Sequence, residues 1–247
     1  MILEYIRPQK LDEALMYLEK PNHYPMGGGT WLSMKRDEAY VVVDLQSLGL
    51  NSIEKKGNNL KIGACATLQD LYEWVDCPLG LKKAIRLEAG HNLRNAASIA
   101  GSLVTCDGHS PFATSLLGLD AKISFAGKPA DKEISLGDYL PMRPKGLITR
   151  ISIPLNVNFA FESVGRSKYD QPVVCAAVAR WGSGRTRLAL GGCFANPTLA
   201  MDGTEADGIE AAAQNAFQDA QDEWASSAYR REIAATLASR CLKSMDI

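Results

Sequence analysis

The stretch with the clearest chemical potential is Gly27 to Thr30, three consecutive glycines followed by a threonine. Each glycine adds backbone entropy that folding must remove, so the run indicates a sharp turn or a close approach to the backbone. Successive unhindered N–H groups can form a concavity that binds anionic oxygens, and the Thr30 hydroxyl adds a donor. A pyrophosphate would suit such a loop, although a plain turn accounts for the same residues.

A second segment with ligand-binding character runs from Ala97 to Pro111 and consists mainly of small residues and hydroxyls. This composition suits backbone and hydroxyl contacts to a polar ligand that lies flat on the chain. A loop of small residues packed against another loop would have the same composition. Within the segment, Asp107, His109 and Ser110 supply an acid, a base and a hydroxyl, but neighbouring loop residues rarely point at one another. We therefore assign no catalytic side chain.

Several familiar site types have no counterpart in this sequence. The G-x-x-x-x-G-K-[ST] pattern of P-loop nucleotidases is absent, and no G-x-G-x-x-G joins a strand to a helix. The cysteines are widely scattered, with no C-x-x-C pair and no cysteine–histidine cluster. Zinc sites and iron–sulfur clusters usually show such short ligand spacings, so we expect no metal site and reduced, buried cysteines. Any redox carrier held by this chain is expected to be organic.

The composition is that of an ordinary globular protein. Hydrophobic residues make up 46% of the 247 residues and charged residues 22%, and the formal net charge is −1. This charge balance offers no broad attraction to a polyanion, which argues against nucleic-acid binding. No apolar run reaches the length of a signal peptide or of a spanning helix, so we expect a cytoplasmic protein without membrane contact.

Hydrophobic periodicity, turn residues and a capping pattern at Thr67 predict the elements that carry these segments. In the first part of the chain we expect a helix over 11–18 that ends before Pro21, extended segments over 23–26 and 40–45, and a hairpin over 53–64. Three further helices are expected: one that begins after Thr67, one over 79–87 and one over 111–119.

The later part of the chain changes from strands to helices. Strands are predicted over 121–125, 147–153, 159–166, 173–181 and 186–193, and a helical pattern takes over from about residue 206. The acidic residues Asp219, Asp222 and Glu223 indicate a solvated junction between helices. The segregation of strands from helices predicts an α+β fold. We place a domain boundary near residue 155, which gives domains of residues 1–155 and 156–247.

The two small-residue segments, in this order and at this separation, resemble the FAD-binding domain of molybdenum hydroxylases, which include xanthine dehydrogenase and carbon monoxide dehydrogenase. The first loop of that family typically reads A-G-G-T-D-L, which residues 27–32 follow except at Gly27 and Trp31. Its second typically reads R-N-x-A-T-I-G-G-N, which residues 94–102 fit. Further similarities follow in the family's order, at residues 116–121, 147–151, 164–170, 190–192 and 227–231, so that the resemblance covers essentially the whole chain.

The resemblance implies an N-terminal FAD-binding domain of the molybdenum hydroxylase type, followed by a small antiparallel sheet with C-terminal helices. In the family, the two loops clasp the FAD pyrophosphate and ribityl chain, and the isoalloxazine ring sits where the domains meet. Carried over by position, the resemblance implies cofactor contacts at Met26, Gly27, Gly28, Gly29, Thr30, Trp31, Ser98, Ile99, Ala100, Gly101, Ser102, Thr105, Ser110 and Ile148.

Besides Gly27, the sequence departs from the family pattern at several other positions. The family usually has asparagine and aspartate where this chain has Ser102 and Pro111, and Trp31 and Ala100 replace an aspartate and a glycine. Ser102 keeps a hydrogen-bonding group, whereas Pro111 offers neither a carboxylate nor an N–H. Asp107 is a candidate for a compensating carboxylate. These changes bear directly on FAD affinity.

By this resemblance, the chain is the FAD-binding electron-transfer subunit of a xanthine dehydrogenase-like hetero-oligomer. A molybdopterin-binding large subunit would oxidise the substrate, and a 2Fe-2S small subunit would pass electrons to this FAD, which delivers them to NAD⁺ or another acceptor. Two alternatives remain open. The chain could be a flavin-free scaffold subunit of such a complex, or a stand-alone flavoprotein oxidoreductase with a small substrate of its own.

Overall fold

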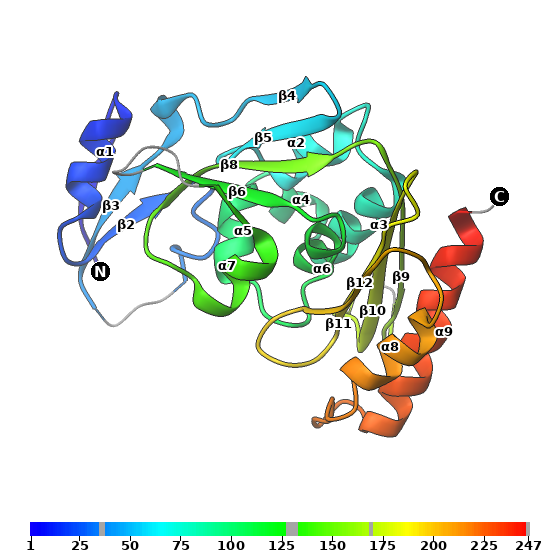
Figure 1. Cartoon of the computed structure of the whole chain (residues 1–247). Coiled ribbons are helices and arrows are strands. Elements are labelled where there is room, and N and C mark those ends of the chain that lie inside the picture. The colour runs from blue at the N-terminus through cyan, green and yellow to red at the C-terminus, as the bar shows by residue number, and fades with distance from the viewer. Residues whose placement is uncertain (35–37, 127–132, 168–169, 246–247) are drawn as a thin grey trace.

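Figure 1 shows the structure, a computed structural model that describes residues 1–34, 38–126, 133–167 and 170–245. Its strands form three sheets, and a layer of helices separates the five-stranded sheet from the four-stranded one. The two C-terminal helices, Ile209–Ala216 and Ser227–Met245, cover the outer face of the four-stranded sheet. The mixed fold, with strands and helices grouped rather than alternating, confirms the predicted α+β class.

The N-terminal sheet is parallel, with the strand order β1-β3-β2. Its central strand is buried along its whole length, and helix α1 packs Ala14 against Val43 of that strand. The buried carboxylate of Asp44 accepts hydrogen bonds from Tyr5 and, at 2.6 Å, from Arg7. The predicted helix and extended segments are confirmed, whereas β1 was not predicted. The elements are β1 (Ile2–Ile6), α1 (Leu11–Leu18), β2 (His23–Met26) and β3 (Tyr40–Asp44).

The second sheet is antiparallel throughout, with the strand order β4-β5-β8-β6-β7. The predicted hairpin forms its first two strands, and Gly57 turns between them with a φ of 59°. A short 3-10 helix, η1 (Gln46–Leu48), leads toward this sheet. The strands are β4 (Ile53–Lys56), β5 (Asn59–Gly63), β6 (Lys122–Ala126), β7 (Glu133–Ser135) and β8 (Leu147–Pro154).

The helices of this part are set by local caps and by contacts from distant strands. At Thr67 the predicted capping arrangement forms, since Asp70 N–H donates to Thr67 Oγ1 at 3.0 Å and Thr67 N–H donates to the Asp70 carboxylate at 2.8 Å. The segment from Ala97 to Ser110 is not a continuous loop, because a helix occupies its first half. The helices are α2 (Leu68–Glu73), α3 (Leu79–Glu88), α4 (His91–Arg94), α5 (Ile99–Thr105), α6 (Pro111–Gly118) and α7 (Leu136–Met142).

The third sheet is antiparallel, with the strand order β12-β11-β10-β9, and is covered by helices on both faces. On β10, Cys175 and Ala177 join the core shared with α3 and α6, while Val174 and Val178 pack on the other side against α8 and α9. Alternation of side chains along a strand produces this division. The elements are β9 (Val157–Val164), β10 (Val174–Trp181), β11 (Thr186–Gly191), β12 (Thr198–Gly203), α8 (Ile209–Ala216) and α9 (Ser227–Met245).

The acidic junction between α8 and α9 lies where the sequence predicted it, but one of its residues is more than a solvated charge. Asp222 forms an ion pair at 2.8 Å with Arg230, whose side chain is fully buried. The same guanidinium donates to the carbonyl oxygens of Val173, Ala220 and Ala225. This network anchors α9 to the third sheet. Among the described helices, none is long and apolar enough to cross a bilayer.

Candidate cofactor-binding site

The site forms where the turn after β2 meets the chain that follows β5 and the start of α5. Backbone hydrogen bonds hold the last two segments together: Leu68 N–H donates to the Ala97 carbonyl at 3.0 Å, and Ile99 N–H donates to the Ala66 carbonyl at 2.8 Å. The Ser98 hydroxyl caps α5 by accepting from Gly101 N–H at 3.2 Å. The two segments predicted to bind a ligand are therefore brought together by the chain between them.

The glycines of the first loop allow this close packing. A Cβ atom on Gly28 would lie 1.5 Å from the Ala96 carbonyl oxygen, and one on Gly27 would lie 2.5 Å from Ser98 Oγ. Gly29 has a φ of 69°, a conformation that side chains disfavour. From the sequence, the glycine run was predicted to form a sharp turn or to allow a close approach to the backbone. The structure shows a turn at Gly29 and a closely approaching neighbouring loop at Gly27 and Gly28.

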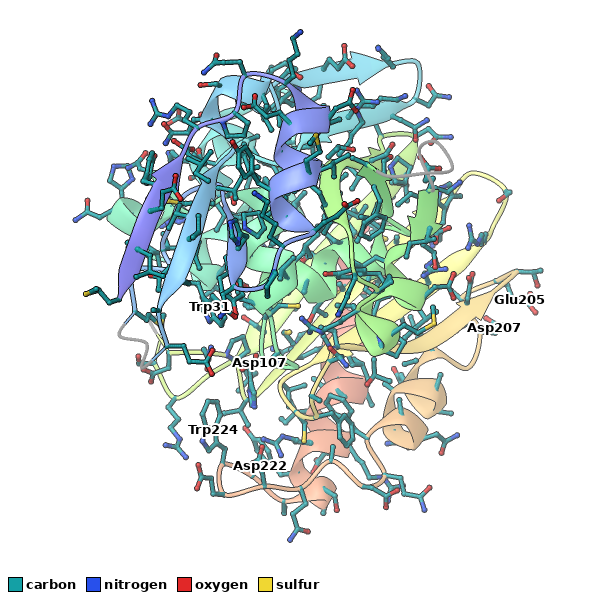
Figure 2. The ribbon with its side chains drawn as sticks, turned by 90° about the vertical axis from the view of Figure 1, so that its left-hand side faces the viewer. Trp31, Asp107, Glu205, Asp207, Asp222 and Trp224 are labelled. Atoms are coloured by element: carbon teal, nitrogen blue, oxygen red, sulfur yellow. The ribbon has the colours of Figure 1, made fainter. Side chains whose placement is uncertain are left out.

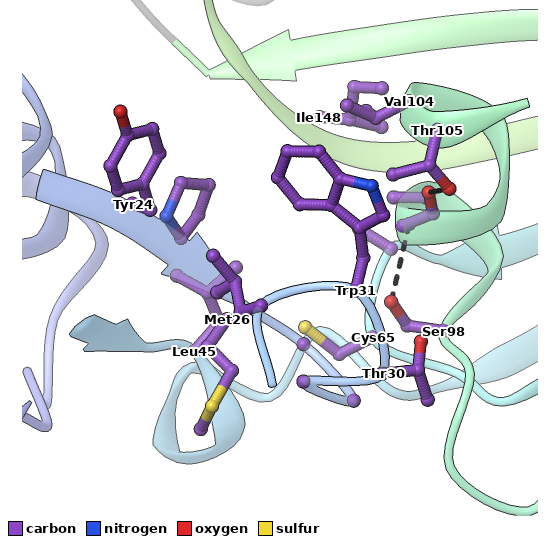
Figure 3. Close-up of a pocket in the computed structure, with 18 of the residues that line it drawn as sticks. Tyr24, Met26, Thr30, Trp31, Leu45, Cys65, Ser98, Val104, Thr105 and Ile148 are labelled. Atoms are coloured by element: carbon purple, nitrogen blue, oxygen red, sulfur yellow. Dashed lines mark hydrogen bonds between the residues drawn. The ribbon is translucent and has the colours of Figure 1, made fainter. Parts of the chain in front are cut away.

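The loops enclose a cavity of about 220 Å³, shown in Figure 3. Most of the residues predicted to contact the cofactor line it together. These are Met26, Gly27, Gly28, Gly29, Thr30, Trp31, Ser98, Ala100, Gly101, Thr105 and Ile148. A cavity of this size is smaller than the roughly 300–1,000 Å³ of typical ligand sites, so it accommodates only part of a dinucleotide.

Three predicted contacts lie outside this lining. Ile99 is fully buried in the core beneath α5, and Ser110 is buried as the N-cap of α6. Ser102 is half-buried on α5 and does not belong to the residues found around the cavity. Sequence reasoning also missed lining residues that come from β2, β8 and α5 or from the chain next to β2, β3, β5 and β8. These are Tyr24, Pro25, Leu32, Leu45, Ala64, Cys65, Val104, Gly146 and Leu147.

The polar part of the cavity offers donors suited to an anion. Within the described ranges, the N–H groups of Gly28, Gly29 and Thr30 donate to no protein acceptor. The Ser98 hydroxyl accepts from Gly101 N–H, which leaves its proton available to a ligand, whereas Thr105 donates its proton to the Gly101 carbonyl at 2.9 Å and keeps lone pairs available. A pyrophosphate on the glycine loop, with hydroxyl groups beside it, fits these donors and acceptors.

No ionised side chain is found around this cavity in the part of the chain that the structure describes. Burial raises the pKa of the Cys65 thiol to about 11, so the thiol stays protonated near neutral pH. The rest of the wall is apolar, including Leu45, Val104, Leu147 and Ile148. The arrangement can bind a ligand with an anionic centre and a planar apolar ring, and it contains no thiolate nucleophile.

A carboxylate is present at the start of α6 although Pro111 cannot provide one. The Glu88 carboxylate accepts hydrogen bonds from the Ser110 hydroxyl at 2.8 Å and from Phe112 N–H at 3.0 Å. The Glu88 carboxyl group is buried, although the residue as a whole is only half-buried. This burial raises the pKa of the carboxyl group above its usual range. Glu88, rather than Asp107, places a carboxyl group at the start of α6, and its distance in sequence from Ser110 gave no signal of this contact.

Asp107, His109 and Ser110 do not form a catalytic group. Asp107 accepts a hydrogen bond from the backbone N–H of His109 at 2.9 Å, and the His109 ring contacts Pro172 O at 3.2 Å and the ring of Trp224. Ser110 turns toward Glu88 instead. Figure 2 shows Asp107 on the same face of the molecule as Trp31 and Trp224. The segment after α5 therefore links the cavity region to the C-terminal part of the chain.

Residues 1–156 match the sequence model of a protein family described as "FAD binding domain in molybdopterin dehydrogenase". The chain belongs to this family. A relative that covers nearly its whole length is "Uncharacterized protein YgfM" of Escherichia coli strain K12, which is 28% identical over 96% of this chain and 94% of its own. Membership of the FAD-binding domain family agrees with the resemblance and with the donors around the cavity.

Solved structures of similar fold extend the comparison to the C-terminal part. A chain of quinoline 2-oxidoreductase from Pseudomonas putida 86 superposes with a TM-score of 0.82 at 20% identity, covering 98% of this chain and 96% of that chain. A chain of reconstituted CO dehydrogenase from Oligotropha carboxidovorans gives a TM-score of 0.82 at 23% identity, with the same coverage. The fold shared with these structures, including the antiparallel sheet after residue 156, therefore extends over essentially the whole chain.

Proposed function

We propose that this chain holds FAD as the electron-transfer subunit of a molybdenum hydroxylase of the xanthine dehydrogenase kind. A molybdopterin-binding large subunit would oxidise the substrate, and 2Fe-2S clusters on a small subunit would pass the electrons to this FAD. The FAD would then transfer them to NAD⁺ or another acceptor. The observation that carries the proposal is the cavity at which both family segments meet, with free N–H donors on Gly28, Gly29 and Thr30.

The chain's own residues would bind and orient the cofactor. The glycine loop would donate to the pyrophosphate, the Ser98 hydroxyl would donate and the Thr105 hydroxyl would accept beside it, and Ile148 would contribute to the apolar wall. Bound FAD supplies the exchange between one-electron and two-electron carriers. The role of these side chains would therefore be to hold and orient the cofactor.

The first test is the visible absorption spectrum of the purified full-length chain, before and after incubation with FAD and removal of the excess. We expect a flavin spectrum and about one FAD per chain, identified by mass after release. A chain that stays colourless after FAD addition, while remaining folded, would refute cofactor binding by the isolated subunit. Turnover of a small substrate by this chain alone would instead support a stand-alone flavoprotein.

A second experiment, on the complex purified from its native cell, tests the identity of the partner subunits and of the electron acceptor. A tagged chain purified from its own cell should bring with it molybdenum and iron, which metal analysis detects. Adding NADH to the complex without oxygen should bleach the flavin band if NAD⁺ is the physiological acceptor. Retention of molybdenum and iron without any flavin would identify the chain as a scaffold subunit.

A further inference from the structure

The cavity has two chemically different halves. The glycine loop, Ser98 and Thr105 form a polar half, and apolar side chains form the other half. A ligand that satisfies both halves carries an anionic group close to a planar apolar ring. This description suits a flavin dinucleotide at either of its ends, because the pyrophosphate is joined to the isoalloxazine ring through the ribityl chain and to adenine through a ribose.

Trp31 is the residue that joins the two halves. It follows Thr30 directly, and its indole rises from the glycine loop toward Ile148 and Val104, as Figure 3 shows. The turn that carries it is closed by Ser33 N–H, which donates to the Gly29 carbonyl at 2.9 Å. The backbone at Trp31 is thus held by the same turn that presents the phosphate-binding N–H groups.

The indole exposes apolar surface beside this cavity. Trp31 is 48% exposed and Val104 is 49% exposed, and both line the same space. Single exposed apolar side chains are common on protein surfaces, but two that border one cavity form a surface that a flat ligand would cover. An indole offers a large, rigid face for stacking on another aromatic ring at little entropic cost.

We infer that Trp31 is a stacking platform for an aromatic ring of the bound dinucleotide, while the preceding Gly27–Thr30 loop holds the phosphates. The inference rests on the proposed function, since it requires that FAD is the ligand. It assigns a role to Trp31, which stands where the family pattern has an aspartate. An aspartate at this position would offer a charged carboxylate, whereas the indole offers apolar contact to a ring.

The test compares FAD binding by the full-length wild-type chain and by the variants Trp31→Ala and Trp31→Phe. Loss of one base–aromatic stack weakens binding by roughly tenfold, so we expect this loss in Trp31→Ala and near-normal affinity in Trp31→Phe. FAD should quench tryptophan emission in the wild type, and this quenching should shrink in Trp31→Phe. The matched control is Trp181→Phe, because Trp181 lies at the end of β10 under the Arg185 guanidinium.

Titrations with FMN and with ADP distinguish the two rings. The compound whose affinity falls in Trp31→Ala carries the ring that stacks, and a fall for either one supports the inference. Affinities that are unchanged or tighter in Trp31→Ala, measured in a wild type that binds FAD, would overturn it; tighter binding would mean that the indole obstructs the cavity. A wild-type chain that binds no FAD would instead refute cofactor binding by the isolated subunit, and the inference with it.

Discussion

Gly28 and Ala96 approach each other so closely that the smallest side chain at position 28 would separate the two binding loops. We expect Gly28→Ala to destabilise the protein by about 1–3 kcal/mol, as overpacking typically does, and to abolish most FAD binding. The cause is the Ala96 carbonyl oxygen, 1.5 Å from the new Cβ. Gly182→Ala is the control, since Gly182 faces open space in the β10–β11 turn. Thermal melting and FAD titration measure both effects, and normal affinity in Gly28→Ala would contradict the packing argument.

The buried carboxyl of Glu88 predicts a pH dependence of stability. Burial raises its pKa above the ordinary value of 4.5, so the native state keeps a proton that the unfolded state releases. Stability contributed by this group therefore falls as pH rises from about 4.5 through the raised pKa. Glu88→Gln retains an acceptor for Ser110 and Phe112 but carries no charge.

The measurement for Glu88 is the difference in melting temperature between Glu88→Gln and the wild type as a function of pH. We expect this difference to increase in favour of Glu88→Gln as pH rises above 4.5. The exposed Glu210→Gln provides the control and should show a smaller change. A difference that stays constant with pH would show that Glu88 is not buried with a raised pKa.

The residues of the site were partly predictable, and the missing ones share a physical reason. The glycine loop and Ser98 belong to short contiguous motifs, so the sequence alone identifies them as candidate binding residues. Tyr24, Cys65 and Leu147 line the same cavity only because the ends of β2, β5 and β8 meet in space. Ile99 illustrates the opposite case, because its side chain is buried in the core although its neighbours Ser98 and Ala100 line the cavity.

Among the elements, those with strong local signals were predicted and those fixed by distant contacts were not. The helix over Leu11–Leu18 and the hairpin at Gly57 have clear periodicity and turn residues. Strand β1 pairs in parallel with β3, so its partner Tyr40 lies far along the chain from Ile2. Helix α5 contains glycine and serine, which disfavour helices, and contacts from Ala64 and Ala66 stabilise its first turn.

The C-terminal end of α5 is held by one side chain. Arg143, just after α7, donates to the carbonyl oxygens of Val104 at 2.6 Å and Cys106 at 2.7 Å, and to Asn196 Oδ1 at 2.7 Å. Since these acceptors lie on the cavity-lining helix and on the C-terminal part of the chain, we expect Arg143→Ala to loosen the cavity wall.

For Arg143→Ala we expect FAD affinity to fall by about tenfold, which corresponds to one lost hydrogen bond to a charged group. Hydrogen exchange of residues 103–110 should also increase. Arg143→Lys should recover only part of the affinity, because an ammonium group lacks the planar fork that reaches several acceptors. Lys145→Ala, at an exposed neighbouring position, is the control. Unchanged exchange in Arg143→Ala would show that α5 does not depend on this contact.

Across the whole molecule, the proposed boundary at residue 155 separates two sheets but does not separate two cores. Phe161 and Cys175, from the C-terminal part, belong to the same buried cluster as Phe112 and Leu116 of α6. The four-stranded sheet is thus packed on one face by helices of the N-terminal part and on the other by α8 and α9. One face of the four-stranded sheet is therefore buried only by its contacts with the N-terminal part.

This shared core predicts that the chain unfolds in a single cooperative transition, with equal calorimetric and van't Hoff enthalpies. Phe161→Ala, which removes a side chain that is 2% exposed, should destabilise the protein by about 3–5 kcal/mol and lower the melting temperature on the order of 10 °C. The whole transition should move, because the ring contacts both parts of the core. Phe194→Ala, at a position that is 42% exposed, should have a smaller effect. Two separate calorimetric transitions, of which only the C-terminal one responds to Phe161→Ala, would instead establish residues 1–155 and 156–247 as independently stable domains.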